Sequence, residues 1–305
     1  MIYIAPVQGH TDAPWRHFHQ SVYGGDLRYF TPFVHYERGQ ARPRDLRDFT
    51  SPLNGNHHPE PQIIFRNMEE LRVLAASLAE SGASEINLNM GCPFPLQTGK
   101  GRGAAIVANT AEIARLPETL AEFPHISFSV KMRLGQTDPY EWKDIMHILN
   151  DLPLRFIALH PRVGRQQYGG DLHIQSFNEF CSQCHHPVIF NGEIREPAHY
   201  ALAIEATPGA AGIMIARGIL ARPSLSSEIM QGRCWSRQER IDEMLRFHRL
   251  LLGHYSSVLC GEAQVLSKIK PFWEYAEEEI GHASMKAIKK AGNMARYTSA
   301  ISGIQ

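Results

Sequence analysis

Residues 61–90 read PQIIFRNMEELRVLAASLAESGASEINLNM, and the rest of the fold can be worked out from this segment. The runs at 61–66 and 85–90 are rich in the apolar and β-branched residues that favour strands. Between them, residues 68–81 place apolar side chains at three- and four-residue spacing, which predicts an amphipathic helix. A strand, a helix and another strand in this order are typical of a βαβ unit.

The same alternation recurs along the chain. Helical patterns fill several of the gaps between β-rich runs, most clearly at 110–121, and the runs start 24 to 42 residues apart. Eight such units predict a (β/α)8 TIM barrel of the α/β class. An open doubly wound sheet is the alternative, but no GxGxxG motif follows the first run. Strands are predicted at 2–7, 29–34, 61–66, 85–90, 127–132, 155–160, 187–192 and 212–217.

The character of the chain changes after residue 235. No further β-rich run appears, and helices are predicted at 237–256, 261–280 and 283–300. We therefore expect two domains, a barrel over 1–235 and a small all-helical domain over 236–305. The gap at 35–60 contains Pro, Gly and Asn, so part of it is expected to form an exposed loop.

Composition narrows the class of protein. The 305 residues include 31 Lys+Arg and 31 Asp+Glu, so a uniformly basic coat for nucleic acid is excluded, although a local basic patch is not. No apolar run is long enough to span a membrane, and residues 1–10 do not have the pattern expected of a secretory signal. Five cysteines are too few for a disulfide scaffold, which favours free thiols in the cytoplasm. No stable protein partner is implied.

Polar residues follow five of the predicted strands. They are Asn89 to Cys92, Lys131, His160, Asn191 and Arg217. In a TIM barrel the carboxyl ends of the strands meet at one face and carry the active site. We therefore expect these side chains to share one mouth, the alternative being ordinary surface loops.

For each of these residues, a purely structural role is the alternative to a role in binding or catalysis. Asn191-Gly192 and Arg217-Gly218 lie at the ends of the last two predicted strands, 187–192 and 212–217, where such barrels bind phosphate, but Arg217 also suits a surface ion pair. Lys131 is suited to stabilise the negative charge on a reduced flavin. The alternative is a structural lysine at the barrel rim whose charged end reaches solvent. His160 is suited to donate a hydrogen bond to a flavin carbonyl or phosphate. The alternative is a buried core histidine with its own partners in the protein. Cys92 lies in a loop stiffened by prolines, and the alternative is an inert thiol.

The sequence Cys181-Ser182-Gln183-Cys184-His185-His186 looks at first like a metal site. Structural zinc needs four ligands, usually as two separated pairs, and no second pair with suitable spacing is present elsewhere. The segment also leads into the strand at 187–192, away from the expected active face. We therefore predict no metal site.

The motifs together resemble the tRNA-dihydrouridine synthase family, flavoenzymes that reduce uridine in tRNA. The compact chain and Gln8 are most similar to bacterial members, in particular the dihydrouridine synthase C subgroup. The strings NMGCP and VKMRLG, in this order, are highly specific. The matching segments are 5–12 (APVQGHTD), 62–64 (QII), 89–93 (NMGCP), 101–105 (GRGAA), 130–135 (VKMRLG), 160–162 (HPR), 168–170 (YGG), 191–194 (NGEI) and 214–218 (MIARG).

The resemblance implies a barrel that binds FMN, a helical domain that follows it, NADPH as the reductant and tRNA as the partner. It implies that Cys92 donates a proton and that Asn89 contacts the uracil. The residues implied at the flavin and its phosphate are Pro6, Val7, Gln8, Gln62, Lys131, His160, Asn191, Gly192, Glu193, Ala216 and Arg217.

The chain departs from the family pattern at several positions. Val7 replaces a usual Met, Glu193 a usual Asp and Ala216 a usual Gly, while Asn87 lies where an acidic residue is common. Phe65-Arg66 replaces a turn that contains glycine. None of these changes removes Cys92 or Lys131.

Basic residues near the C-terminus are the expected contacts to tRNA. Between Ile280 and Gln305 the chain has four basic residues and no Asp or Glu. They are Lys286, Lys289, Lys290 and Arg296, and on one helix they would lie near one face. Lys268 and Lys270 are expected to extend this patch, and Arg102 is the expected substrate contact at the barrel mouth. The alternative is an ordinary solvated helix face.

The expected function is the reduction of the C5=C6 bond of specific uridines in tRNA. Two alternatives remain at this point. One is an FMN-dependent reductase of a free pyrimidine or another small molecule, which would not explain the extra helices. The other is a tRNA-binding protein that has lost catalysis, which the presence of Cys92 and Lys131 disfavours.

Overall fold

The computed structural model describes residues 1–304, apart from the side chains of residues 56 and 57. Eight parallel strands form one sheet in the order β2-β1-β10-β9-β8-β7-β6-β5. All eight predicted strands are confirmed, most with shifted ends. Their bounds are β1 (Ile2–Ile4), β2 (Leu27–Tyr29), β5 (Gln62–Ile64), β6 (Glu85–Met90), β7 (Ser127–Gly135), β8 (Leu154–Val163), β9 (Val188–Phe190) and β10 (Gly212–Ile215).

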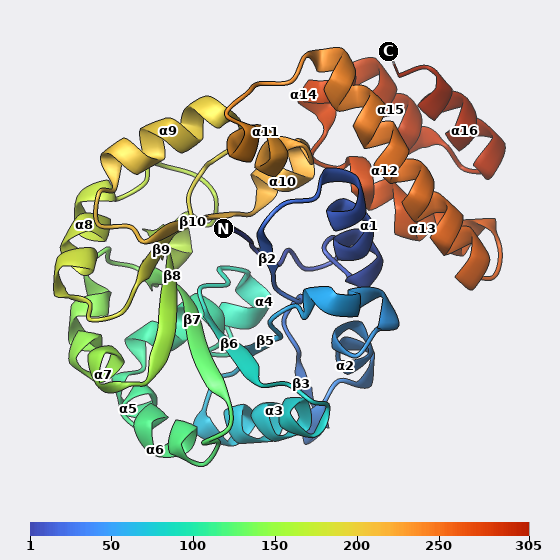
Figure 1. Ribbon diagram of the computed structural model, residues 1–305. Helices are drawn as coiled ribbons and strands as arrows, with labels where there is room; N and C mark the ends of the chain where they lie inside the picture. The colour runs from blue at the N-terminus through green and yellow to red at the C-terminus, as the bar shows by residue number, and fades with distance from the viewer. Residues whose placement is uncertain (305) are drawn as a thin grey trace.

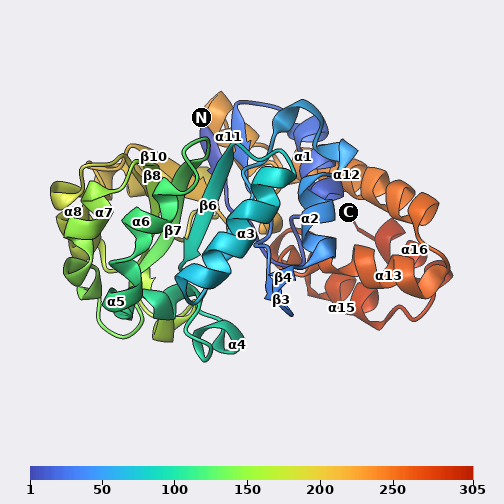
Figure 2. The same cartoon turned by 90° about the horizontal axis from the view of Figure 1, so that it is seen from below.

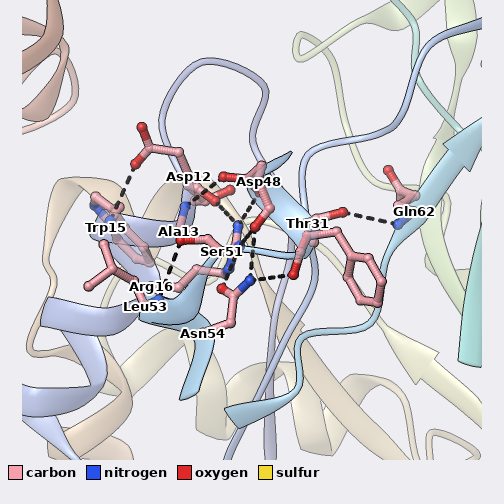
Figure 3. Close-up of polar contacts among 12 residues, drawn as sticks. Asp12, Ala13, Trp15, Arg16, Thr31, Asp48, Ser51, Leu53, Asn54 and Gln62 are labelled. Carbon is pink, nitrogen blue, oxygen red and sulfur yellow. Dashed lines mark hydrogen bonds and ion pairs between the residues drawn. The ribbon is translucent and has the colours of Figure 1, made fainter. Parts of the chain in front are cut away.

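The sheet closes between its two outer strands. Isolated parallel bridges join Phe30 to Glu60 and Val34 to Ile63, in the segments that follow β2 and flank the start of β5. The Gln62 N–H also donates to the hydroxyl of Thr31 at 3.2 Å, a contact drawn in Figure 3. The eight strands therefore form a barrel, which confirms the predicted (β/α)8 class.

The barrel interior has two unlike halves. Apolar side chains fill the half under β1, β2, β8, β9 and β10, where the rings of Tyr3, Phe30 and Phe156 pack together. Polar side chains occupy the other half, along β5, β6 and β7, and include Gln62 and Asn87. Layers of inward-pointing side chains fill such barrels, so this polar half lies in a packed interior and not in a pore.

Helices surround the barrel, and the C-terminal helices lie to one side of it next to α1 (Figure 1). Local signals explain several of the ends. The side chain of Asn67 caps α3, and the Ser236 and Glu239 side chains form a capping box on α12. The helices of the barrel are α1 (Ala13–Tyr23), α2 (Pro43–Phe49), α3 (Met68–Glu80), α4 (Pro95–Thr98), α5 (Thr110–Ile113), α6 (Leu116–Ala121), α7 (Met146–Asp151), α8 (Ile174–Gln183), α9 (Pro197–Ala206), α10 (Arg217–Ala221) and α11 (Leu225–Gln231).

The C-terminal region is helical as predicted, with more breaks than expected. Its 3-10 turn at Lys270–Trp273 contains Pro271, which interrupts the helix predicted at 261–280. The helix predicted at 283–300 is two helices, because Asn293 caps a new one through the N–H of Arg296. The helices are α12 (Arg237–Val258), α13 (Glu262–Ile269), α14 (Glu277–Ile280), α15 (His282–Lys290) and α16 (Met294–Ser302).

One other expectation needs correction. The helix predicted at 110–121 is divided into α5 and α6, because Pro117 has no N–H to donate and its ring would clash with the preceding turn. The segment 35–60 contains the expected exposed turn, at Arg38 and Gly39, together with regular structure. It contains the hairpin of β3 (Tyr36–Glu37) and β4 (Gln40–Ala41), helix α2 and a 3-10 turn at Pro52–His57.

Among residues 1–304, no helix combines the length and the apolar character that crossing a membrane requires.

Candidate functional site

A cavity opens at the carboxyl ends of the strands. Its lining includes Cys92, Asn89 and every residue that was expected at the flavin. These residues come from seven different strands or the loops that follow them and are far apart in the sequence, so the barrel closure brings them together. The lining residues from that expectation are Pro6, Val7, Gln8, Gln62, Lys131, His160, Asn191, Gly192, Glu193, Ala216 and Arg217.

The loop that carries Cys92 is held by its neighbours on both sides. The side-chain oxygen of Asn89 accepts hydrogen bonds from the N–H groups of Gly91 and Cys92, at 3.1 and 2.9 Å. The Nε of Arg133 donates to the Gly91 carbonyl at 3.0 Å, and the Cys92 carbonyl accepts from the Ala104 N–H at 3.0 Å. These hydrogen bonds hold the loop on both sides of Cys92.

Gly103 packs directly against this loop. Its φ is 60°, and a Cβ added there would lie 2.4 Å from the Cys92 carbonyl oxygen. Only glycine fits such a contact in this conformation. Burial raises the pKa of the Cys92 thiol, against the opposing effects of a hydrogen bond from the Phe94 backbone and the charges of Lys131 and Arg133. The thiol is therefore protonated at neutral pH.

Lys131 is a cation without a counter-ion. It lies beside Asn89 in the register of β6 and β7 and lines the cavity. Within residues 1–304 no carboxylate pairs with its ammonium group. Burial, together with the nearby Arg133, lowers the pKa of Lys131 to about 8. An unpaired cation in a cavity wall is suited to a ligand that carries negative charge.

A group of guanidinium side chains surrounds Glu193. One carboxylate oxygen accepts from Arg162 at 2.6 Å and from Arg217 at 2.5 Å, and the other accepts from Arg195 at 3.0 Å. Burial opposes ionisation of Glu193, but the hydrogen bond from Arg162 and the charge of Arg217 lower its pKa. Arg195 and Arg217 line the cavity and Arg162 is buried behind Glu193, so positive charge exceeds negative charge here, which suits an anion.

Aromatic and backbone contacts complete this end of the cavity. The guanidinium carbon of Arg217 lies 4.1 Å from the centre of the Tyr168 ring, which is a cation–π distance. A Cβ at Gly218 would lie 1.9 Å from the Ile194 carbonyl oxygen, so only glycine is possible there. His160 is buried, and its burial together with the charge of Arg133 lowers its pKa well below the usual value. His160 is therefore neutral.

The first loop of the barrel is anchored to α1 and α2. Asp12 caps α1 by accepting from the Trp15 N–H at 3.3 Å, and Asp48 accepts from the Ala13 N–H at 2.7 Å (Figure 3). The buried Arg16 guanidinium donates to Asp48 at 2.9 Å and to Asn54 at 2.8 Å. These contacts fix the chain that directly follows Pro6 to Gln8, and thereby one wall of the cavity.

Several lining residues were missed as site residues. Arg133 and Tyr168 both lie in the quoted motifs, so the sequence contained a signal for their role. The strand pattern alone does not show that their side chains point into the cavity. Phe33 and Tyr275 also line the cavity. Tyr275 comes from the segment between α13 and α14, and its ring centre lies 5.2 Å from that of His10. No signal in the sequence connects it with the barrel mouth.

Arg102 lies elsewhere than expected. It is absent from the cavity lining, and its side chain is buried against Glu70. Its Nε and a terminal nitrogen donate to the two Glu70 oxygens at 2.9 and 2.6 Å. Because this bidentate pair uses the charge of Arg102 within the protein, the expectation of a free substrate contact is wrong for this conformation.

The basic residues of the C-terminal region fall into two groups. Lys286, Lys289 and Lys290 are exposed on α15, whereas Arg296, which was expected on the same helix, lies on α16 and lines a shallow groove with Lys290. Lys270 is not free, because its ammonium group donates to the Ala291 carbonyl at 2.5 Å. Helices α15 and α4 extend toward the same side of the molecule (Figure 2).

The cysteine and histidine residues at 181–186 do not gather into a metal site. Over residues 1–304, no group of three or more His, Cys, Asp or Glu side chains has an arrangement that could hold a metal ion. Burial, with a smaller effect of Cys184, raises the pKa of Cys181 to about 12, which disfavours the thiolate that a metal would need.

Solved structures share the architecture at low sequence identity. A structure of morphinone reductase superimposes with a TM-score of 0.54, covers 77% of this chain and 86% of that chain, and is 12% identical. Histamine dehydrogenase from Rhizobium sp. 4-9 also gives a TM-score of 0.54, at 14% identity, and covers 76% of this chain and 46% of that chain. These similarities support the barrel fold.

The sequence relatives described below are all named as tRNA-dihydrouridine synthases. A probable tRNA-dihydrouridine synthase of Rhodobacter capsulatus is 26% identical over 259 residues, which cover 85% of this chain and 79% of the relative. Probable tRNA-dihydrouridine synthase 2 of Bacillus subtilis is 28% identical over 262 residues, with 83% and 78% covered. The family model described as dihydrouridine synthase matches residues 3–292. The chain therefore belongs to the dihydrouridine synthase family.

Proposed function

We propose that this protein reduces the C5=C6 bond of uridines in tRNA to 5,6-dihydrouridine, with FMN bound in the barrel cavity and NADPH as the reductant. The observation that carries the proposal is the meeting of a protonated thiol, Cys92, and an unpaired cation, Lys131, in one cavity at the strand ends. The family membership and the names of the relatives support the same reaction.

The donors around the cavity fit FMN. The guanidinium groups of Arg162, Arg195 and Arg217 exceed the charge of Glu193 and suit a phosphate. Lys131 suits the negative charge that a reduced flavin carries at the pyrimidine end of its ring system. Val7 and Gln8 offer a wall for the flat ring system, and Gly218 permits a close approach of chain segments beside the phosphate end.

When bound, reduced FMN would supply a hydride to C6 of the uracil ring, and NADPH would restore the reduced form. Cys92 holds the proton that C5 needs, because its raised pKa keeps the thiol protonated at neutral pH. One hydride and one proton together add two hydrogens across the double bond. The thiolate that remains lies near the positive charges of Lys131 and Arg133, which stabilise it until solvent returns a proton.

The tRNA would meet the protein on two surfaces. The target uridine must leave the base stack to reach a cavity at the end of a barrel. Lys286, Lys289 and Lys290 would contact phosphates from the helical domain, which we assign to 236–305, while 1–235 carries the chemistry. Arg102 is left out of the proposed contacts because Glu70 pairs with it. The tRNA substrate implies a cytoplasmic location.

An assay of purified protein with two substrates tests this proposal. The protein, with FMN and NADPH, is given either an unmodified tRNA transcript or free uridine, and dihydrouridine is measured by mass spectrometry. We expect dihydrouridine in the tRNA and none from free uridine. Comparable reduction of free uridine would favour a small-molecule reductase, and no reduction of either substrate by flavin-loaded protein would contradict the proposal.

A further inference from the structure

A column of polar side chains runs through the barrel interior, from the cavity wall along β5, β6 and β7. Its members are Glu60, Gln62, Asn87, Asn89 and Ser129, and each is at most 7% exposed. The strand register brings them together, because Asn87 is paired with Gln62 on one side and with Ser129 on the other. Buried polar groups of this kind require partners within the protein.

The hydrogen bonds of this polar column form one unbroken chain. The Cys92 N–H donates to Asn89 at 2.9 Å, and the Asn89 amide donates to Gln62 at 2.7 Å. The Gln62 amide then donates to Asn87 at 2.7 Å, and the Asn87 amide donates to Ser129 at 2.6 Å. The Ser129 hydroxyl donates to Glu60. Every bond in the chain points the same way, from the Cys92 loop toward Glu60.

The two ends of the polar column fix this direction. The N–H groups of Gly91 and Cys92 can only donate, so the Asn89 oxygen must face them. At the other end, Glu60 forms ion pairs with Arg28 at 3.1 Å and Arg155 at 2.6 Å, so it accepts as a carboxylate. Reversing any amide between these ends would place two donors or two acceptors face to face.

The direction of these hydrogen bonds determines which polar groups of Gln62 and Asn89 remain for a ligand in the cavity. The side-chain oxygens of Gln62 and Asn89 are both engaged within the column. One N–H of each amide remains, and both residues line the cavity. The wall therefore presents hydrogen-bond donors to the ligand, which suit carbonyl oxygens of a flavin or a pyrimidine.

We propose that Asn87 and Ser129, which are absent from the cavity lining, are positioning residues for the reaction. They act through Gln62 and Asn89, because they hold these amides in the orientation that supports the Cys92 backbone and aims the free N–H groups into the cavity. The inference rests on the proposed function only for the role of Cys92 as proton donor. The orientation itself is a property of the protein without flavin or tRNA.

A set of variants separates positioning from general stability. Asn87→Leu removes both bonds of Asn87, and Ser129→Ala removes the acceptor for Asn87 and the donor to Glu60. Asn87→Asp keeps an acceptor for Gln62, so the part of the column between Gln62 and Cys92 keeps its direction. Ser226→Ala is the matched control, because Ser226 is a fully buried serine whose hydroxyl has no partner in the described structure.

The test measures the alkylation rate of Cys92 by iodoacetamide in flavin-free protein, with site-resolved mass spectrometry. Cys234 and Cys260 are exposed and are replaced by Ser in every variant. If each variant weakens the support of the Cys92 loop by about the net free energy of one hydrogen bond, Asn87→Leu and Ser129→Ala should react roughly 3- to 10-fold faster than the parent protein. Asn87→Asp and Ser226→Ala should stay within about twofold of it, because the loop support remains.

A second readout uses the flavin-loaded protein and tRNA. Asn87→Leu and Ser129→Ala should lower kcat with little change in KM for tRNA, because neither residue contacts the RNA. Alkylation of Cys92 at the parent rate in both variants would overturn the proposal, as would equal effects of Asn87→Asp and Asn87→Leu. If Asn87→Leu fails to fold, the alkylation rates of Ser129→Ala and Asn87→Asp alone test the proposal. A parent protein inactive on tRNA would contradict the proposed function, while the alkylation rates would still test the positioning.

Discussion

The ammonium group of Lys268 lies 2.7 Å from the carboxylate of Asp12, although 256 positions separate the two residues in the chain. The same carboxylate caps α1 and accepts a hydrogen bond from the Tyr255 hydroxyl at 3.0 Å. Tyr255 lies on α12 and Lys268 on α13. One side chain thus connects the C-terminal helices to the loop that forms a wall of the cavity.

The two contacts to Asp12 should differ in their effect on stability. Tyr255 is buried, and losing its hydrogen bond to a charged group in Tyr255→Phe should lower the free energy of unfolding by about 1.5–3 kcal/mol. Lys268 is half exposed, so Lys268→Ala should cost less than about 1 kcal/mol. Urea unfolding followed by circular dichroism measures both. A larger loss in Lys268→Ala than in Tyr255→Phe would contradict this assignment.

Arg217 and Arg195 both contact Glu193, and they provide a matched pair for the phosphate end of the cavity. Arg217 is partly buried and stacks on Tyr168, whereas Arg195 is half exposed. Arg217→Ala should raise the Kd for FMN about 10- to 100-fold, the range for one lost charge-assisted hydrogen bond. Arg195→Ala should change it less than about threefold.

Titration of flavin fluorescence measures these constants in flavin-free protein. Equal affinities of the Arg217→Ala variant and the parent protein would show that the phosphate is bound elsewhere.

The affinity for FMN should also depend on pH through Lys131. Its pKa is lowered to about 8 in the protein without ligand, so Lys131 is charged below that pH and neutral above it. Binding that uses the charge should be constant below pH 7 to 8 and weaken as pH rises further. Lys131→Met should bind more weakly at pH 7 and lose this dependence. A parent protein whose affinity is unchanged between pH 7 and 9.5 would exclude a charge contact from Lys131.

The exposed lysines of α15 should contribute to tRNA binding through phosphate contacts. The triple variant Lys286/Lys289/Lys290→Ala should raise the apparent KM for tRNA and leave NADPH oxidation by the flavin unchanged. Each lost contact should lower the slope of log affinity against log salt by about one. Filter binding at several salt concentrations measures the slope. An unchanged slope and affinity would place the tRNA on another surface.

Much of the fold could be predicted from the sequence because its signals are local. The run at 85–90 matches β6 residue for residue, since the apolar Ile86, Leu88 and Met90 recur at the two-residue period of a strand. The helix breaks at Pro117 and Asn293 were also visible in the sequence, as a residue without an N–H and as a capping residue. Reading them as breaks would have corrected the predicted helices.

Other features depend on contacts between distant segments and could not be predicted in this way. The pairing of Arg102 with Glu70 requires that the loop after α4 lies against the start of α3. The place of Tyr275 in the cavity wall requires the docking of the C-terminal helices. The direction of the polar column requires the strand register, because the residues Gln62 and Asn87 are 25 positions apart.

The central claim is that this cavity reduces uridine in tRNA with Cys92 as the proton donor. The direct test compares Cys92→Ala with the parent protein, each loaded with FMN, on the same unmodified tRNA. Dihydrouridine formation per minute is measured by mass spectrometry. The account predicts equal FMN content and a rate about 100- to 10,000-fold lower in the variant, the usual effect of losing a general acid. Dihydrouridine formation by Cys92→Ala at the parent rate would contradict it.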